Sequence, residues 1–167
     1  MSTTQTDLPG GLGAEYAAAD EYRPLGGYAV LTATFGTALT GGLIAAHKAG
    51  RIPERIAPLD IALAGIATHK LSRLITKDKI TGTLRAPFTR FQEKSGHAEV
   101  EEAPRGRGLR YAIGELLVCP YCIAQWVSGS FTMGYVFAPK TTRLLATMWT
   151  VHAISDAAQL AYSAAES

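Results

Sequence analysis

Two long stretches without aspartate, glutamate, lysine, arginine or histidine limit what this chain can fold into more than any other feature. The first covers 23 residues, from Pro24 to Ala46, and the second covers 24 residues, from Leu116 to Pro139. At a rise of about 1.5 Å per helical residue, each is long enough to cross a hydrocarbon layer roughly 30 Å thick. Because backbone polar groups in lipid must be satisfied within the protein, both stretches predict transmembrane helices.

Two further segments are apolar but carry a few polar or charged side chains. The segment from Pro58 to Ile75 is amphipathic, and its proline suits a first helical turn. The segment from Leu144 to about Ala165 is interrupted by His152, Asp156 and Gln159. We therefore predict an all-α fold, a polytopic α-helical membrane protein with four hydrophobic helices. The alternatives are three spans plus one amphipathic interfacial helix at residues 58–75, or a soluble helical bundle.

The basic residues are concentrated in the middle of the chain. Ten of the sixteen lysines and arginines fall between Lys70 and Arg110, and short loops rich in these residues stay on the cytoplasmic side of a membrane. If four helices span the membrane, eleven lysines and arginines lie on the cytoplasmic side and five on the outer side. If three helices span, the numbers are thirteen and three. Both arrangements predict a multi-pass protein of the cell membrane with the middle loop and the C-terminus in the cytoplasm.

The charge pattern also indicates how the chain is organised. Residues 1–22 are polar and carry four acidic but no lysine or arginine side chains, so we predict a flexible acidic tail and no secretory signal peptide. We predict that residues 23–167 form a single helical membrane domain. Its basic cytoplasmic loop, at about residues 76–110, contains glycines, prolines and mixed charges that we expect to build no core of its own.

The sharpest local motif is the run Cys119-Pro120-Tyr121-Cys122, which contains both cysteines of the chain. A CxxC pair at the start of a helix can acquire a reactive thiolate, and it also supplies two ligands for a soft metal. A structural zinc site usually needs four ligands, and no second cysteine pair is present. Three roles therefore stay open: packing thiols, a redox-active or reversible disulfide, and a metal site.

His152 and Asp156 stand four residues apart on one face of the predicted fourth helix. An ionisable group inside the hydrocarbon layer is costly, so such groups are functional candidates, although they can also pair to fix helix packing. If the third helix runs outward and the fourth runs back, a thiol or metal site can combine five residues, namely Glu115, Cys119, Cys122, His152 and Asp156. The sequence leaves the catalytic residues unknown, and we predict no cofactor apart from the metal alternative.

Basic side chains at the predicted loop and at the end of the second helix are candidates for contact with lipid headgroups. The run from Leu84 to Phe91 alternates basic and apolar side chains, which suits an anionic cytoplasmic membrane surface. A net charge of +2 without a basic stripe argues against nucleic acid as a partner. The predicted headgroup contacts are Lys70, Arg73, Lys77, Arg85 and Arg90.

Three runs of residues together suggest a family. They are Arg73-Leu74-Ile75-Thr76-Lys77-Asp78, Leu84-Arg85-Ala86-Pro87-Phe88, and Glu115-Leu116-Leu117-Val118-Cys119-Pro120-Tyr121-Cys122 followed by Trp126. Over roughly residues 57 to 137 the chain resembles the bacterial membrane-protein family known as domain of unknown function 1360, one member of which is called a sporulation protein. The resemblance implies a membrane location and supplies no catalytic residue.

Small residues within the first apolar stretch and the lack of a complete catalytic set favour a non-enzymatic role. We predict an integral membrane protein that works as a structural or interaction subunit through helix association. Its expected partners are the lipid bilayer and either a membrane protein or a second copy of the chain. The alternatives are a membrane thiol protein that uses the cysteine pair, and a small transporter subunit that uses the charged groups of the fourth helix.

Overall fold

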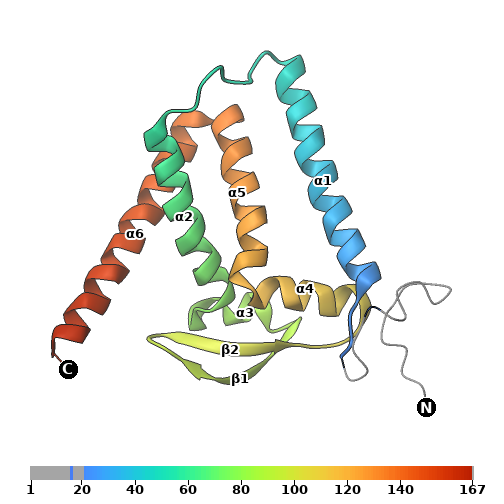
Figure 1. The fold of residues 1–167 in the computed structure, drawn as a ribbon, viewed down its shortest axis with the longest axis vertical. Helices are drawn as coiled ribbons and strands as arrows, with labels where there is room; N and C mark the ends of the chain where they lie inside the picture. The colour runs from blue at the N-terminus through green and yellow to red at the C-terminus, as the bar shows by residue number, and fades with distance from the viewer. Residues whose placement is uncertain (1–15, 17–20, 167) are drawn as a thin grey trace. The chain divides into compact units, whose positions relative to one another are not determined.

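The computed structural model describes residue 16 and residues 21–166, and these form a mostly helical structure with one small two-stranded sheet (Figure 1). Most of the predicted acidic tail lies outside the described residues. The helices and strands are, in chain order, α1 (Leu25–Lys48), α2 (Pro58–Thr76), the 3₁₀ turn η2 (Lys79–Thr81), α3 (Gly82–Arg85), β1 (Thr89–Ser95), β2 (Glu99–Pro104), α4 (Gly108–Val118), α5 (Pro120–Phe137) and α6 (Pro139–Glu166).

The four predicted helical segments are helical in the structure, and three of the long helices begin at a proline. Pro58, Pro120 and Pro139 open α2, α5 and α6, because proline has a fixed φ that suits a helix start and lacks the N–H that would be unpaired there. The stretch from Leu116 to Pro139 is nevertheless not one helix. Cys119 is extended, with φ −105° and ψ 104°, because the residue before a proline is disfavoured in the helical region.

The loop predicted for about residues 76–110 is folded, which corrects the all-α prediction. β1 and β2 form an antiparallel hairpin with Thr89 opposite Pro104 and Ser95 opposite Glu99. Gly96 and Ala98 reverse the chain between the strands with φ of 56° and 62°. The other edge of β2 is also engaged, since Val100 donates its backbone N–H to the carbonyl of Lys77 at 2.8 Å.

The chain forms two compact units. The first unit comprises the described residues of Met1–Ala38 and Thr76–Pro120, and the second comprises those of Leu39–Ile75 and Tyr121–Ser167. The first unit therefore holds the first half of α1, the hairpin, η2, α3 and α4. The second unit holds the end of α1 together with α2, α5 and α6.

Glycines allow close packing within the first unit. A Cβ at Gly27 of α1 would lie 2.7 Å from the Cβ of Ala112 on α4. A Cβ at Gly114, on the side of α4 that faces the hairpin, would lie 2.6 Å from the backbone oxygen of Phe88 and 3.0 Å from the Cβ of Pro104. The lack of side chains at these two glycines lets α4 pack both on α1 and on the end of the hairpin (Figure 1).

We expect Gly114→Ala to lower the free energy of unfolding by about 1–3 kcal/mol, because the new methyl group overlaps backbone that cannot easily move. Gly36→Ala is the matched control, since no described atom lies within 4 Å of the Cβ position of this helical glycine. That change should leave stability equal or raise it by up to about 1 kcal/mol. Thermal unfolding of the purified variants measures both effects, and equal melting temperatures for the two would contradict the packing described for α4.

The second unit buries small and aliphatic side chains between its helices. Arg51, in the link after α1, donates to the backbone oxygen of Phe137 at 3.2 Å and so binds the carboxyl end of α5. A Cβ at Gly134 would lie 2.6 Å from the hydroxyl of Thr142, which allows α5 and α6 to approach closely. The buried apolar residues of this unit are Ala46, Ala67, Ile123, Val127, Phe131 and Ala146.

The exposed surface of the long helices is strongly apolar. Among the described residues, α1 alone is long and apolar enough to cross a membrane by itself, and only 6% of its most apolar window is buried. α4 and α5 pass the same test only as a pair that is sharply bent at Cys119, which corresponds to a broken span or to a re-entrant loop. The predicted helical character is therefore confirmed, whereas the number of four spans stays a prediction. α6 exposes Leu144, Leu145, Met148, Val151, Ile154, Leu160 and Tyr162.

Candidate functional site

Polar contacts join α2 to α6 along the length of the second unit. The Arg143 guanidinium donates to both carboxylate oxygens of Asp60, at 2.7 and 2.6 Å. Further along, the hydroxyl of Thr150 donates to the backbone oxygen of Leu63 at 3.1 Å. These contacts advance in the same direction on both helices, so α2 and α6 run parallel to each other.

The third contact of this series brings together three ionisable side chains. Nζ of Lys70 on α2 lies 2.6 Å from Oδ2 of Asp156 on α6. Nε2 of His152, one turn earlier on α6, lies 3.6 Å from Oδ1 of the same carboxylate, and its ring stacks on Trp149. The side chain of Lys70 is only 10% exposed, so its charge is compensated by Asp156 rather than by solvent.

The predicted pairing of His152 with Asp156 appears in this cluster, but Lys70 was predicted for a different role. Lys70 was expected at the headgroups because it is a long basic side chain near a helix end, whereas its ammonium group is paired with Asp156 within the unit. The signal that could have identified it is a lysine that follows Leu63, Ile66 and Ala67 on one mainly apolar helical face. A charge in such a position is usually paired.

A second polar network lies in the first unit and is centred on Arg85 of α3. The guanidinium is fully buried, at 0% exposure, and it donates to both carboxylate oxygens of Glu102 on β2, at 3.1 and 2.9 Å. It also donates to the hydroxyl of Thr81 at 2.7 Å and to the backbone oxygen of Asp78 at 3.0 Å. This two-point ion pair ties the turn before the hairpin to its second strand.

The carboxylate of Glu102 is held in its charged form. Burial by itself would raise the pKa of Glu102, but hydrogen bonds from Arg85 and Thr89 and the charges of Arg85 and Lys77 outweigh burial and lower the pKa below its ordinary value. Lys77 in turn pairs with Glu101 at 2.7 Å. The lowered pKa favours the carboxylate form of Glu102, which accepts both hydrogen bonds from Arg85, and the pair therefore functions as a structural clamp.

The five residues predicted to contact lipid headgroups differ in their surroundings, and their contact with lipid stays a prediction. Arg85 has no exposed surface and Lys77 pairs with Glu101, so neither offers a free charge to a lipid. Arg73 is half-buried, and Arg90 at the start of the hairpin is exposed. Sequence spacing alone did not reveal this difference, because it depends on acidic partners 17 to 24 residues further along the chain.

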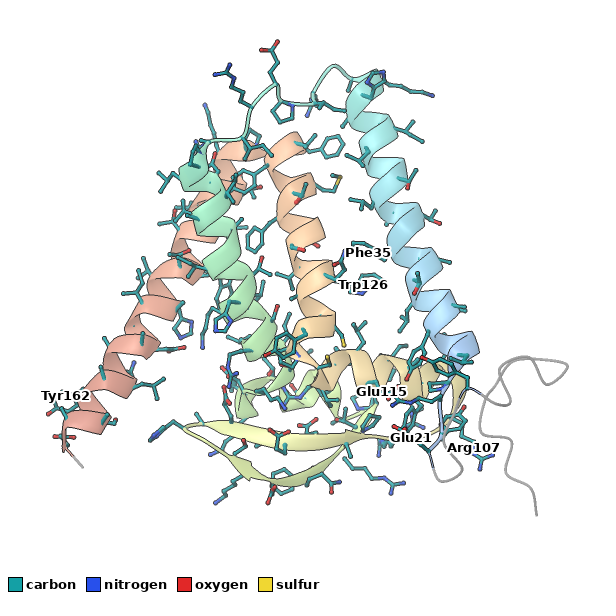
Figure 2. All side chains as sticks on the ribbon, in the orientation of Figure 1. Glu21, Phe35, Arg107, Glu115, Trp126 and Tyr162 are labelled. Carbon is teal, nitrogen blue, oxygen red and sulfur yellow. The ribbon has the colours of Figure 1, made fainter. Side chains whose placement is uncertain are left out.

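Glu115, the acidic member of the predicted site, has other partners within the first unit. The phenol of Tyr28 on α1 donates a hydrogen bond to Oε2 of Glu115, and Nη1 of Arg23 lies 3.9 Å from Oε1. Arg23 also pairs with Glu21 at 2.6 Å. Glu21 and Glu115 accordingly lie near the start of α1 (Figure 2). This cluster anchors the beginning of α1 on α4.

The two cysteines are disulfide-bonded. Cys119 is the extended residue that ends α4, and Cys122 is exposed in the first turn of α5. Among the described residues, no group of three or more histidine, cysteine, aspartate or glutamate side chains is arranged to hold a metal ion. Contacts within the predicted site join Cys119 with Cys122 and His152 with Asp156. A single site that contains all five residues stays a prediction.

Comparisons with known proteins agree with the sequence motifs. Sporulation protein YjcA of Bacillus subtilis (strain 168) is 32% identical over 90 residues, which are 52% of this chain and 76% of YjcA. UPF0713 protein YngL of the same organism is 29% identical over 90 residues, which are 52% of this chain and 65% of YngL. No solved structure matches the chain.

Residues 63–162 match one family over more than half of the chain. The match extends from α2 to α6 and includes Lys70, Arg85, Glu102, the cysteine pair and Asp156. The resemblance expected from the sequence motifs is confirmed. The chain belongs to the family described as protein of unknown function (DUF1360).

Proposed function

We propose that this protein is an integral membrane protein whose helices α1, α2, α5 and α6 cross the bilayer, and that it acts as a structural or interaction subunit. The observation that carries the proposal is the distribution of polarity on the helices. Apolar side chains such as Leu144 and Ile154 are 70% and 61% exposed, whereas Lys70 and Thr150 are 8% and 6% exposed. Such a surface is costly in water and stable in lipid, where interior polar groups bind one another.

Open small-residue positions support association as the mode of action. No described atom lies within 4 Å of the Cβ positions of Gly36 and Gly41 on α1 or of Gly65 on α2. Membrane helices approach one another closely at such positions, since lipid provides no hydrophobic driving force between helices. The name of the relative YjcA supports sporulation as the cellular setting.

The location is tested by fractionation and by labelling of single cysteines. The protein should remain in the membrane pellet after an alkaline wash and should require detergent for solubility. In a Cys119→Ser, Cys122→Ser background, a membrane-impermeant thiol reagent applied to intact cells should label Glu54→Cys and Ala138→Cys. His97→Cys in the hairpin turn should react only after permeabilisation, because the basic loop is cytoplasmic.

Each outcome of this labelling distinguishes one arrangement from another. Labelling of Ala138→Cys without Glu54→Cys corresponds to three spans with α2 in the interface. Labelling of His97→Cys in intact cells contradicts the sidedness proposed here. A chain that stays monodisperse in buffer without detergent contradicts the membrane location itself.

The disulfide favours a second candidate function, that of a membrane thiol protein. A bond between Cys119 and Cys122 closes a very short loop, so it constrains the unfolded chain less than a long-range disulfide does. A reversible redox role accounts for such a bond better than stabilisation does. Alkylation of free thiols in growing cells should then divide the protein into two populations, one alkylated because its cysteines are reduced and one unmodified because they form the disulfide. A pair that stays in one form under both oxidising and reducing growth conditions contradicts this candidate.

A further inference from the structure

We propose that the exposed side of the 79–84 turn, formed by η2 and the start of α3, inserts into an anionic lipid surface. The proposal rests on the membrane location proposed above and names one surface that meets the headgroup region. The turn exposes two large aliphatic side chains, Ile80 at 81% and Leu84 at 66%. Ile80 lies in η2 and Leu84 in α3, which follow each other directly in the chain.

The turn buries its arginine and exposes large aliphatic side chains, which is unusual for the surface of a soluble protein. Its inner side consists of the hydroxyl of Thr81 and the guanidinium of Arg85, both engaged in the network with Glu102. Its exposed side carries the aliphatic side chains of Ile80 and Leu84 together with Lys79 and Thr83. A short segment that buries its arginine and exposes two large aliphatic side chains beside a lysine is suited to the interface between lipid and water.

The Arg85 clamp prevents the turn from rotating to hide its aliphatic side chains. Rotation that buried Ile80 and Leu84 would remove Arg85 from Glu102 and Asp78 and leave the Glu102 carboxylate without its main partner. Breaking a buried pair in this way is strongly unfavourable. The outward direction of the two aliphatic side chains is therefore fixed by the ion pair.

The charge of the segment identifies the surface as anionic lipid. Residues 79–90 contain Lys79, Arg85 and Arg90 but no aspartate or glutamate. Glu102 compensates Arg85, which leaves two exposed positive charges in this segment, Lys79 next to Ile80 in the chain and Arg90 in β1. Basic groups next to inserted apolar side chains bind anionic headgroups.

The position of the turn within the first unit supports the same partner. This unit also contains the first half of α1, the helix that passes the test for a membrane span. α1 packs through Gly27 on α4, and α4 packs on β2, to which Arg85 of the turn is bound. This chain of contacts holds the turn in the unit from which α1 enters the membrane.

The test uses the full chain in vesicles with a polarity-sensitive nitrobenzoxadiazole label. Ile80→Cys and Leu84→Cys are labelled separately in the Cys119→Ser, Cys122→Ser background, with His97→Cys as the control on the exposed hairpin turn. In vesicles that contain phosphatidylglycerol, labels at 80 and 84 should show blue-shifted emission and strong quenching by lipids spin-labelled near the headgroup. The label at 97 should be quenched by aqueous iodide.

The charge dependence gives a second readout. With phosphatidylcholine alone, quenching at position 80 should decrease, and Lys79→Gln with Arg90→Gln should abolish the difference between the two lipid mixtures. A label at 80 that is fully accessible to iodide in both mixtures overturns the inference. If the protein meanwhile still requires detergent, the membrane location stands. If the label is shielded in native membranes but not in pure lipid, a protein occupies this surface, and the inference also fails.

Discussion

Arg85→Met should lower the free energy of unfolding of the protein by about 3–5 kcal/mol, the cost of removing one partner of a buried ion pair. The guanidinium is fully buried and binds both oxygens of Glu102. Methionine fills part of the space but leaves the Glu102 carboxylate with much less compensation. Thermal unfolding followed by hairpin and helix signals should show one large decrease in melting temperature.

The matched variants separate the ion pair from simple packing. Arg90→Met removes an exposed arginine five residues further along and should change stability by less than about 0.5 kcal/mol. The double variant Arg85→Met, Glu102→Leu removes both charges. It should lower the free energy of unfolding markedly less than Arg85→Met alone. If Arg85→Met and Arg90→Met prove equally mild, the clamp contributes nothing, and the orientation of the 79–84 turn loses its explanation.

Lys70→Met should lower the free energy of unfolding by about 2.5–3.5 kcal/mol, because it leaves the Asp156 carboxylate without its lysine partner, and an uncompensated charge in a membrane helix costs about that much. Lys70 is 2.6 Å from Asp156, and its loss leaves that carboxylate with the neighbouring His152 as its remaining described partner on the same helix. The expected result is a lower melting temperature in detergent and less protein in the membrane fraction. Lys140→Met, at the exposed start of α6, is the control and should have little effect.

Charge reversal tests whether the pair itself is responsible. Lys70→Asp with Asp156→Lys restores opposite charges at the same two positions and should recover a large part of the stability lost in Lys70→Met. If the exchanged variant recovers no stability while Lys140→Met keeps that of the natural protein, Lys70 acts only through the packing of its aliphatic chain. The double variant Lys70→Met, Asp156→Asn removes both charges. If it is inserted and stable but does not replace the natural protein in cells that lack it, the charges are needed for function rather than for assembly, as the transporter alternative requires.

The helices of this protein were predictable from local sequence, because helix formation depends on composition within one segment. Uninterrupted apolar stretches identified α1 and most of α5, and prolines marked the starts of α2 and α5. The interruption at Cys119 follows from Pro120 by a local steric rule. The family motifs were equally visible, since they are contiguous runs, and the family match confirmed them.

The hairpin and the partners of the charged residues were decided by tertiary structure. β1 and β2 have almost no apolar alternation, and they are stabilised by mutual pairing, by α4 and by the Arg85–Glu102 clamp rather than by their own pattern. Lys70, Lys77 and Arg85 were expected at a lipid surface, yet each has an acidic partner 17 to 86 residues away. The sequence by itself determines where the chain is apolar and helical. Whether a given charge meets solvent, lipid or another charge depends on contacts between distant segments, and these exist only in the folded protein.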